Sequence, residues 1–451
     1  MKWPKFENQK MKTPIIFIAF VGLIGFSSCA QEKRSNPNVI IIYTDDMGYG
    51  DLSSYGNPTI YTPHLDKMVA EGMKLTQFYV ASSVCTPSRA ALMTGAYPKR
   101  VGLEKGVLFP SSETGLNPEE QTIAEILKEQ NYTTACIGKW HLGHQKKFLP
   151  HNQGFDEFFG IPFSNDMSKK EQGYMGRNNY KWRLPLLSQS DTLEFDPDQT
   201  TLTKRLTEEA LNFIKKNKRK PFFLYLAHPM PHIPIYASAK FQNTSVRGPY
   251  GDTIEEIDWS VGQILETLKT QGIDKNTVVI FTSDNGPWKV FKTEGGSSGP
   301  LRGAKGTTWE GGQRVPCIVR WPGKVPAATM QRQVVTNMDI LPTIAKICGA
   351  KLPEKKIDGR DVSRALIEVD QLLDDNPFLY YSKNGKLEGI RDGKFKLLLL
   401  DEGTFLFDVE SDISEVYNLA DTDPNKVNML KEKMEKLDAI LDSEKRTVGK
   451  F

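Results

Sequence analysis

The apolar residues of the chain fall into short, consecutive runs that are separated by longer amphipathic stretches. The first run, residues 39–43, is rich in β-branched side chains and ends at Thr44, Asp45 and Asp46. A short, continuous apolar run bounded by polar residues is typical of a parallel strand that is buried on both faces. Comparable runs, which we also predict to be buried strands, occupy residues 133–137, 222–227, 277–281 and 315–319.

Helical periodicity appears between these runs. Thr62 and Pro63 are typical of the N-cap and first position of a helix, which we expect to end near residue 71. Apolar spacing predicts further helices over residues 118–130, 201–216 and 251–270, and a shorter one from about residue 87 to Gly95. Strands that alternate with helices favour an α/β fold, with helices on both faces of a large, mostly parallel or mixed sheet.

The C-terminal part has a different pattern. Between residues 378 and 418, short apolar runs alternate with turn signals such as Asp392-Gly393, which predicts an antiparallel meander. Apolar residues at helical spacing between residues 425 and 445 predict a helix that packs on this small sheet. We therefore expect a large domain over residues 36–372 and a C-terminal subdomain, an antiparallel sheet plus a helix, over residues 373–451.

The N-terminus has the features of an export signal. Lys10 and Lys12 precede an apolar run over residues 15–26, which is short for a membrane span. Small residues before Cys29 resemble a bacterial lipoprotein processing site, and ordinary cleavage near Ala30 is the alternative. We predict a signal peptide over residues 1–29 and an exported protein, periplasmic or an outer-membrane lipoprotein, whose membrane contact is limited to a lipid on Cys29.

Charge and cysteine content narrow the function classes. The 58 Lys and Arg residues nearly balance the 55 Asp and Glu residues, whereas nucleic-acid binders carry a strong basic excess, so we expect no nucleic-acid partner.

Beyond Cys29 there are four cysteines, which could form disulfides in an exported chain. However, Cys136 and Cys317 lie in apolar runs and are predicted to be small buried hydrophobic residues.

Polar side chains follow four of the predicted strands. Because ligands bind beyond the carboxyl ends of strands in open parallel sheets, we expect these side chains to converge on one site. They are Asp45 and Asp46, then Lys139 and His141, then His228 and His232, and last Asp284 and Asn285.

The two acidic pairs repel one another unless a cation neutralises them. Asp45, Asp46, Asp284 and Asn285 offer only hard oxygen ligands, which suit Ca²⁺ or Mg²⁺. The alternative is that Asp45 and Asp46 cap a following helix.

Cys85 precedes the helix predicted near residue 87. An anion is favoured at a helix N-terminus, so Cys85 could be a nucleophilic thiol with a low pKa. A buried structural cysteine is the alternative from position alone.

The segment Cys85-Thr86-Pro87-Ser88-Arg89 fits the Cys-x-Pro-x-Arg signature of the formylglycine-dependent sulfatases. Further segments are similar to blocks of that family and occur in the same order: Thr94-Gly95, residues 138–143, residues 282–286 and residues 303–312. Over about residues 38–320 the chain therefore resembles the type I sulfatases of the alkaline phosphatase superfamily.

The resemblance implies a fold, cofactors and residue roles. A maturation enzyme would oxidise Cys85 to formylglycine (3-oxoalanine), whose hydrate attacks sulfur. One Ca²⁺ would be held by Asp45, Asp46, Asp284, Asn285 and the modified Cys85. The remaining implied roles are that Arg89 and Lys139 hold the oxygens of the nucleophile, that His141 acts on its second hydroxyl, and that Lys139, His232 and Lys305 contact the sulfate or the leaving oxygen.

The resemblance also indicates a class of substrate, and it leaves two rival functions open. Residues 151–166 resemble the arylsulfatase A and N-acetylgalactosamine-6-sulfatase branch, which favours galactose or N-acetylgalactosamine sulfates in sulfated glycans. We expect Asp166 and Arg302 to face the sugar, with a surface salt bridge as the alternative for each, and Trp288 either to stack on a sugar or to pack in the core. The rival functions are a phosphomonoesterase or phosphodiesterase of the same superfamily and a non-catalytic protein that binds sulfated glycans.

Overall fold

The computed structural model describes residues 1–5, 36–171, 180–368 and 370–451. The chain divides into two units, Met1–Ser35 and Asn36–Phe451. Within the first unit only residues 1–5 are described, and they contain no helix or strand, so most of the predicted signal peptide and the predicted lipid site at Cys29 lie outside the described residues. No helix in the described ranges has the length and apolar content needed to cross a membrane.

A ten-stranded sheet is the centre of the second unit, as far as the chain is described. Its middle strands β10, β1, β9, β5 and β6 are parallel neighbours, whereas β11 and the strands β7 and β8 run antiparallel to theirs. In sheet order the strands are β12 (Thr329–Gln331), β2 (Met73–Leu75), β11 (Cys317–Arg320), β10 (Thr277–Ser283), β1 (Asn38–Thr44), β9 (Phe222–Ala227), β5 (Thr133–Lys139), β6 (Glu157–Ile161), β7 (Pro185–Ser188) and β8 (Asp191–Phe195). The predicted α/β class is confirmed.

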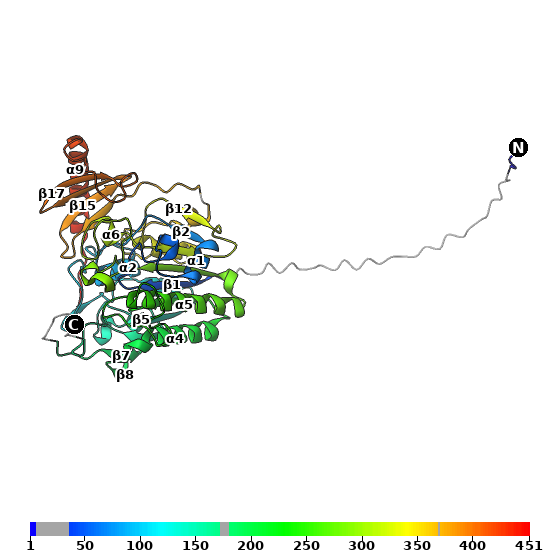
Figure 1. Ribbon diagram of the computed structural model, residues 1–451, viewed down its shortest axis with the longest axis horizontal. Coiled ribbons are helices and arrows are strands. Elements are labelled where there is room, and N and C mark those ends of the chain that lie inside the picture. Colours follow the sequence, from blue (N-terminus) through cyan, green and yellow to red (C-terminus); the bar gives the residue numbers. More distant parts are fainter. Residues whose placement is uncertain (6–35, 172–179, 369) are drawn as a thin grey trace. The chain divides into compact units, whose positions relative to one another are not determined.

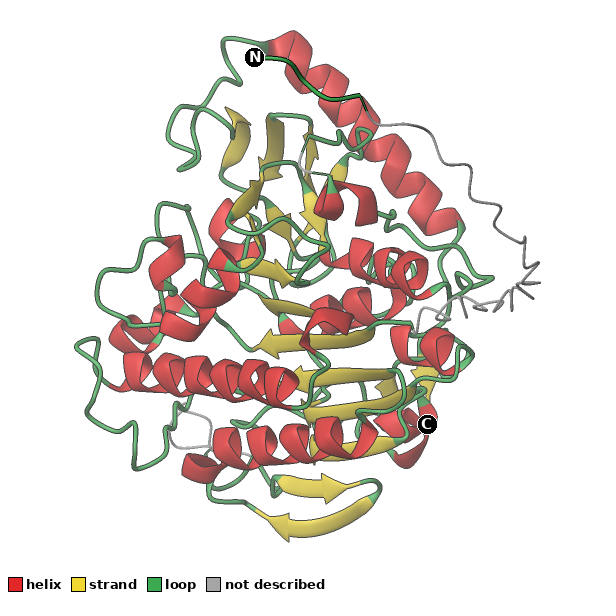
Figure 2. Cartoon of the chain, turned by 90° about the vertical axis from the view of Figure 1, so that its right-hand side faces the viewer, coloured by secondary structure: helices red, strands yellow, loops and turns green. Residues whose placement is uncertain are grey.

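Helices cover both faces of this sheet (Figure 2). Along β1, Val39, Ile41 and Tyr43 face one core and Ile40 and Ile42 face the other, because side chains alternate along a strand. One core is completed by α2 (Cys85–Thr94), α3 (Ile123–Lys128), α7 (Ile340–Cys348) and α8 (Ser363–Ile367), and the opposite core by α1 (Pro63–Ala70), α4 (Leu202–Asn217) and α5 (Pro249–Thr270). Two of these, α4 and α5, lie side by side in Figure 1.

Short elements connect the layers. The remaining α-helix of this region is α6 (Glu310–Gln313), and the small strand pairs are β3 (Phe78–Tyr79) with β13 (Val335–Thr336) and β4 (Thr114–Gly115) with β18 (Gly449–Lys450). The 3₁₀ helices are η1 (Ser53–Tyr55), η2 (Lys146–Phe148), η3 (Pro150–Asn152), η4 (Gln199–Thr201), η5 (Asp274–Asn276), η6 (Lys289–Glu294) and η7 (Asn337–Asp339).

The predicted meander and terminal helix are confirmed. A small antiparallel sheet packs against α9 (Pro424–Ser443), at the upper left of Figure 1. Its strands are β14 (Phe378–Tyr381), β15 (Leu387–Asp392), β16 (Phe395–Leu400) and β17 (Gly403–Asp408). Leu430, Met434 and Leu441 of α9 are buried in this core. The predicted domain boundary at residue 372 stays a prediction.

Three points of the sequence analysis need correction. The strand predicted at residues 315–319 is β11, and it pairs antiparallel with β10. The helix predicted over residues 118–130 is shorter, because Thr122 and Glu125 form a capping box that starts α3 at Ile123. All four cysteines of the described residues are buried and free, so the disulfide alternative is wrong for them.

Candidate active site

The polar residues that follow the central parallel strands lie together, as the sequence predicts. Asp45 and Asp46 follow β1, and Asp284 and Asn285 follow β10 beside it. His232 lies in the segment after β9, and Lys139 is the last residue of β5. Adjacent strand ends therefore deliver acids, amide and cations to one buried place, and α2 brings Cys85 as its first residue.

The two acidic pairs interlock. The Asp46 backbone N–H donates to Asp284 Oδ1 at 3.1 Å, and Asn285 Nδ2 donates to Asp46 Oδ1 at 2.7 Å. Helix capping by Asp45 and Asp46 is the wrong alternative, because the next helix, η1, begins only at Ser53.

Three buried cations hold these carboxylates. Lys139 Nζ donates to Asp45 Oδ2 at 2.5 Å, and Lys305 Nζ donates to Asp46 Oδ2 at 2.7 Å. Arg89 donates to one oxygen of Asp284 through Nε at 3.0 Å and Nη2 at 2.8 Å. Direct contacts with these cations, and not contacts with solvent, therefore hold the buried acids in position.

The three carboxyl groups of this cluster are matched by three cations, yet two of them are not fully stabilised in the charged form. Burial raises the pKa of Asp284 to about 7, and the neighbouring Asp45 adds to that rise against the opposing effect of Arg89. Burial also raises the pKa of Asp46, whereas for Asp45 the effect of burial is outweighed by Lys139 and other cations, so its pKa lies well below the usual value. Asn285 Oδ1 is buried and accepts no hydrogen bond from the described residues. Hard oxygens at two neighbouring strand ends, two carboxyl groups with raised pKa and an unused acceptor fit a divalent cation such as Ca²⁺.

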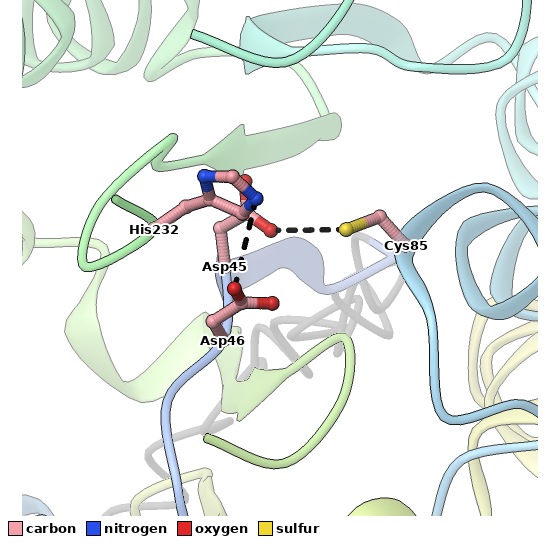
Figure 3. Close-up of side chains that lie close together, drawn as sticks. All are labelled: Asp45, Asp46, Cys85 and His232. Atoms are coloured by element: carbon pink, nitrogen blue, oxygen red, sulfur yellow. Dashed lines mark hydrogen bonds and ion pairs between the residues drawn. The ribbon is translucent and has the colours of Figure 1, made fainter. Parts of the chain in front are cut away.

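Cys85 lies beside the same acids (Figure 3). Its Sγ is 3.4 Å from Asp45 Oδ1 and 3.7 Å from Lys305 Nζ. Burial, followed by the charges of Asp284 and Asp45, raises the thiol pKa well above its usual value. The low-pKa thiol considered from the helix N-terminus is therefore wrong, because burial first, and then the neighbouring carboxylates, disfavour the thiolate. Unmodified, this side chain is a neutral thiol at neutral pH.

The ligand-capable atoms of this cluster are close together. Asp45, Asp46, Cys85 and His232 each offer an atom, and these atoms lie within 4.8 Å of one another (Figure 3). His232 Nδ1 lies 2.5 Å from the Ile233 carbonyl oxygen, and its Nε2 is 3.6 Å from Asp46 Oδ2. If Nδ1 donates to that carbonyl, Nε2 is the basic nitrogen and faces the cluster.

His141 has a free acceptor nitrogen. Its Nε2 is 2.9 Å from the Leu108 carbonyl oxygen, to which it can only donate, so Nδ1 carries the lone pair. Within the described ranges that Nδ1 is buried without a hydrogen-bond partner. Burial first, and then Lys139 and Arg89, lower the pKa of His141 well below its usual value, so the ring is neutral and able to accept a proton. The Nε2 of His228 lies 3.2 Å from Ser260 Oγ of α5.

The two predicted sugar-facing residues differ. Asp166 is buried and lies two residues after Ser164, whose Oγ is 3.1 Å from Lys139 Nζ. Arg302 is tied to the C-terminal part instead, because its guanidinium lies 3.6 Å from the centre of the Trp309 ring and Nη1 donates to the Glu415 carbonyl at 3.0 Å. Sugar contact by either residue stays a prediction.

Two supporting residues escaped prediction from sequence. Ser164 contacts Lys139, and the Tyr225 hydroxyl lies 3.3 Å from Arg89 Nη1. Tyr225 lies inside the apolar run of β9, and Ser164 lies in the stretch 151–166, whose resemblance to the arylsulfatase branch does not single it out as a partner of Lys139.

Comparison with known proteins agrees with this geometry. The family described as Sulfatase matches residues 37–350, and the family described as N-sulphoglucosamine sulphohydrolase, C-terminal, matches residues 304–441. Arylsulfatase A of Homo sapiens is 39% identical over 392 residues, which cover 83% of this chain and 77% of that protein. N-acetylgalactosamine-6-sulfatase of Mus musculus is 40% identical over 404 residues, covering 85% and 74% respectively.

A solved structure is similar over nearly the whole fold. The crystal structure of Ps i-CgsB in complex with k-i-k-neocarrahexaose has a TM-score of 0.80 and 33% identity, and the match covers 89% of this chain and 93% of that one. The family match, the relatives and the shared fold show that the chain belongs to the sulfatase family, whose members hydrolyse sulfate esters.

Proposed function

We propose that this sulfatase is calcium-dependent, uses formylglycine made from Cys85, and removes O-sulfate groups from galactose or N-acetylgalactosamine units of sulfated glycans. The observation that carries the proposal is the buried cluster of Asp45, Asp46, Cys85 and His232, whose ligand-capable atoms lie within 4.8 Å of one another. The arrangement supports one metal ion and one modified side chain sharing the same centre.

The donor set supports Ca²⁺. Asp45, Asp46, Asp284, Asn285 and an oxygen on the modified Cys85 would hold the ion, and the unused acceptor Asn285 Oδ1 supports this assignment. Bound Ca²⁺ would neutralise the acids and polarise oxygens of the nucleophile and of the sulfate. Thiolate-preferring metals fit less well, because the acidic and amide oxygens dominate the set.

Formylglycine would supply a hydrated aldehyde, which provides one hydroxyl for attack on sulfur and a second hydroxyl on the same carbon. Arg89 and Lys139 are placed to orient that carbon's oxygens, since both border Asp45 within 3.6 Å. His141 Nδ1 is the proton acceptor for the second hydroxyl, because its lone pair accepts no hydrogen bond from the described residues.

The leaving side is assigned to two other residues. His232 and Lys305 both lie against Asp46, at 3.6 Å and 2.7 Å. The Lys305 ammonium offers a proton and a positive charge, and His232 would donate to the leaving oxygen once its Nε2 carries a proton. Negative charge that develops on the leaving oxygen is stabilised by such a preorganised pair in a dry site.

The substrate and cellular assignments rest on the relatives. The similarity to an N-acetylgalactosamine-6-sulfatase and to a protein solved with a neocarrahexaose supports a glycan substrate. A maturation enzyme that oxidises Cys85 is the partner required by the proposal. Export, with a lipid on Cys29, is proposed from the N-terminal sequence pattern.

A desulfation screen tests the proposal. Purified protein, produced with a maturation enzyme, would be incubated with singly sulfated galactose and N-acetylgalactosamine, and released sulfate would be measured. We expect turnover of at least one of these sugars, loss of turnover in Cys85→Ser, and normal turnover in the control Cys348→Ala, which removes a buried thiol at the end of α7. Full turnover by Cys85→Ser would show that the assigned nucleophile is wrong.

A further inference from the structure

Trp288 lies directly beyond the predicted metal-binding pair, between Pro287 and the 3₁₀ helix η6. The sequence leaves two roles open for it, sugar stacking or core packing. The structure leaves the side chain partly exposed, and Trp288 belongs to none of the hydrophobic cores among the described residues. Core packing is therefore the poorer explanation.

The indole ring borders the residues assigned to the leaving side of the reaction. Lys305 Nζ lies over the ring at 4.2 Å from its centre, and the rings of His232 and Trp288 are 5.4 Å apart between centres. The leaving group bonded to an oxygen that contacts His232 and Lys305 would therefore lie beside this indole ring.

The loop that carries the ring is held in place. The Lys305 backbone N–H donates to the Pro287 carbonyl at 3.0 Å, which links the positions of Lys305 and Trp288. Farther along, Lys289 Nζ lies 2.5 Å from Ser298 Oγ and Arg247 Nη1 donates to the Thr293 carbonyl at 2.7 Å. A ring that is fixed before the ligand arrives loses little conformational entropy on binding.

We infer that Trp288 is a specificity residue that packs against the sugar ring bearing the sulfate. This inference rests on the proposed function and deepens it, because it assigns the leaving group as a pyranose with an apolar C–H face. Aromatic side chains supply large, rigid apolar surfaces to such ligands, while nearby polar groups fix the orientation. A small alkyl sulfate would leave this surface unused.

The test separates sugar binding from sulfate binding. Wild type, Trp288→Ala and Trp288→Phe would be compared for KM and kcat on the sugar sulfate found in the desulfation screen. Inhibition constants would be measured for the sulfate-free sugar and for inorganic sulfate. Val290→Ala is the matched control, because Val290 is 71% exposed on the same loop.

We expect Trp288→Ala to raise KM and the inhibition constant of the sulfate-free sugar by about tenfold, as expected for loss of aromatic packing. The inhibition constant of inorganic sulfate should change less than about twofold, and Trp288→Phe should recover most sugar affinity. Val290→Ala should leave every constant unchanged. An unchanged constant for the free sugar, or an equal rise for sugar and sulfate, would overturn the inference, the latter because the ring would then only support Lys305.

Failure of the proposed function has a different signature. In that case the wild-type protein releases no sulfate from any sugar in the screen. Binding of galactose and N-acetylgalactosamine to wild type and Trp288→Ala, followed by ligand-observed NMR, then decides the inference by itself. Equal binding by the two proteins, or none by either, would refute the stacking role.

Discussion

Lys396 of β16 joins the small C-terminal sheet to α6 through a buried ionic cluster. Its Nζ lies 2.9 Å from Glu310 Oε1 and 2.8 Å from Glu415 Oε1, and all three side chains are fully buried. Burial raises the pKa of Glu310, but Lys396, Arg314 and Arg391 outweigh it and lower the value to about 2. The lysine therefore separates two acids that would otherwise face each other.

The change Lys396→Met keeps most of the side-chain volume and removes the charge. Because both carboxylates contact one nitrogen, they lie about 5 Å apart, and at an effective dielectric constant of about 20 their repulsion is roughly 3 kcal/mol. Removing one partner of a buried ion pair typically costs about 3–5 kcal/mol in unfolding free energy. With an unfolding entropy of about 2.1 cal/mol/K per residue over roughly 400 residues, this corresponds to a decrease in Tm of about 4–6 °C.

Differential scanning calorimetry at pH 7 measures this effect. The control Lys394→Met removes an exposed lysine whose Nζ lies 2.7 Å from Asp408 on the same sheet. A surface pair contributes about 0–1 kcal/mol, so its Tm should fall by roughly 1 °C or less. The double variant Lys396→Met with Glu415→Gln should regain at least half of the loss, because one of the two facing charges is gone.

Two outcomes would refute this reasoning. One is a Tm of Lys396→Met equal to that of the Lys394→Met control. The other is a double variant that is less stable than Lys396→Met alone, because the repulsion between Glu310 and Glu415 would then not be the source of the cost.

Three further predictions concern the site and its surroundings. Chelation should abolish sulfate release, and Ca²⁺ should restore it better than Zn²⁺; full activity of protein shown to be metal-free by atomic emission would contradict this. Lys139→Ala should lower kcat by about 10²–10³-fold with an unchanged circular dichroism spectrum, since a preorganised charge is lost; a change below threefold would exclude its assigned role. Burial lowers the pKa of His228 to about 4. At this position the unfolded chain therefore binds more protons between about pH 6.5 and 4, and the contribution of His228 to folding stability should fall by roughly 2 kcal/mol from pH 7 to pH 5. In urea titrations His228→Gln should lose less over that range, and an equal loss would contradict the assignment.

The parallel core was predictable because its signals are local. Residues 39–43 and 277–281 are apolar at consecutive positions, and only strands buried on both faces require that pattern. Asp45 and Asp284 could then be placed together without coordinates, because the carboxyl ends of neighbouring parallel strands share one edge. The direction of β11 could not be predicted in this way, because an apolar run does not encode the direction of pairing.

The electrostatics of the site depended on distant contacts. Position at a helix start favoured a low pKa for Cys85, but burial of the thiol, followed by the charges of Asp284 and Asp45 after other strands, raises it instead. Ser164 likewise becomes a partner of Lys139 only through folding. Arg302 directly precedes the motif block at residues 303–312, yet its hydrogen bond to the Glu415 carbonyl connects it to the C-terminal part.

The chemical identity of residue 85 in active protein is the most direct test of the account. Sulfate-releasing protein would be digested, and the peptide containing residues 82–89 would be analysed by mass spectrometry with an aldehyde-specific label. The account predicts that the aldehyde is present and that its fraction rises in proportion to specific activity across preparations. Fully active protein carrying only an intact thiol at position 85 would contradict it.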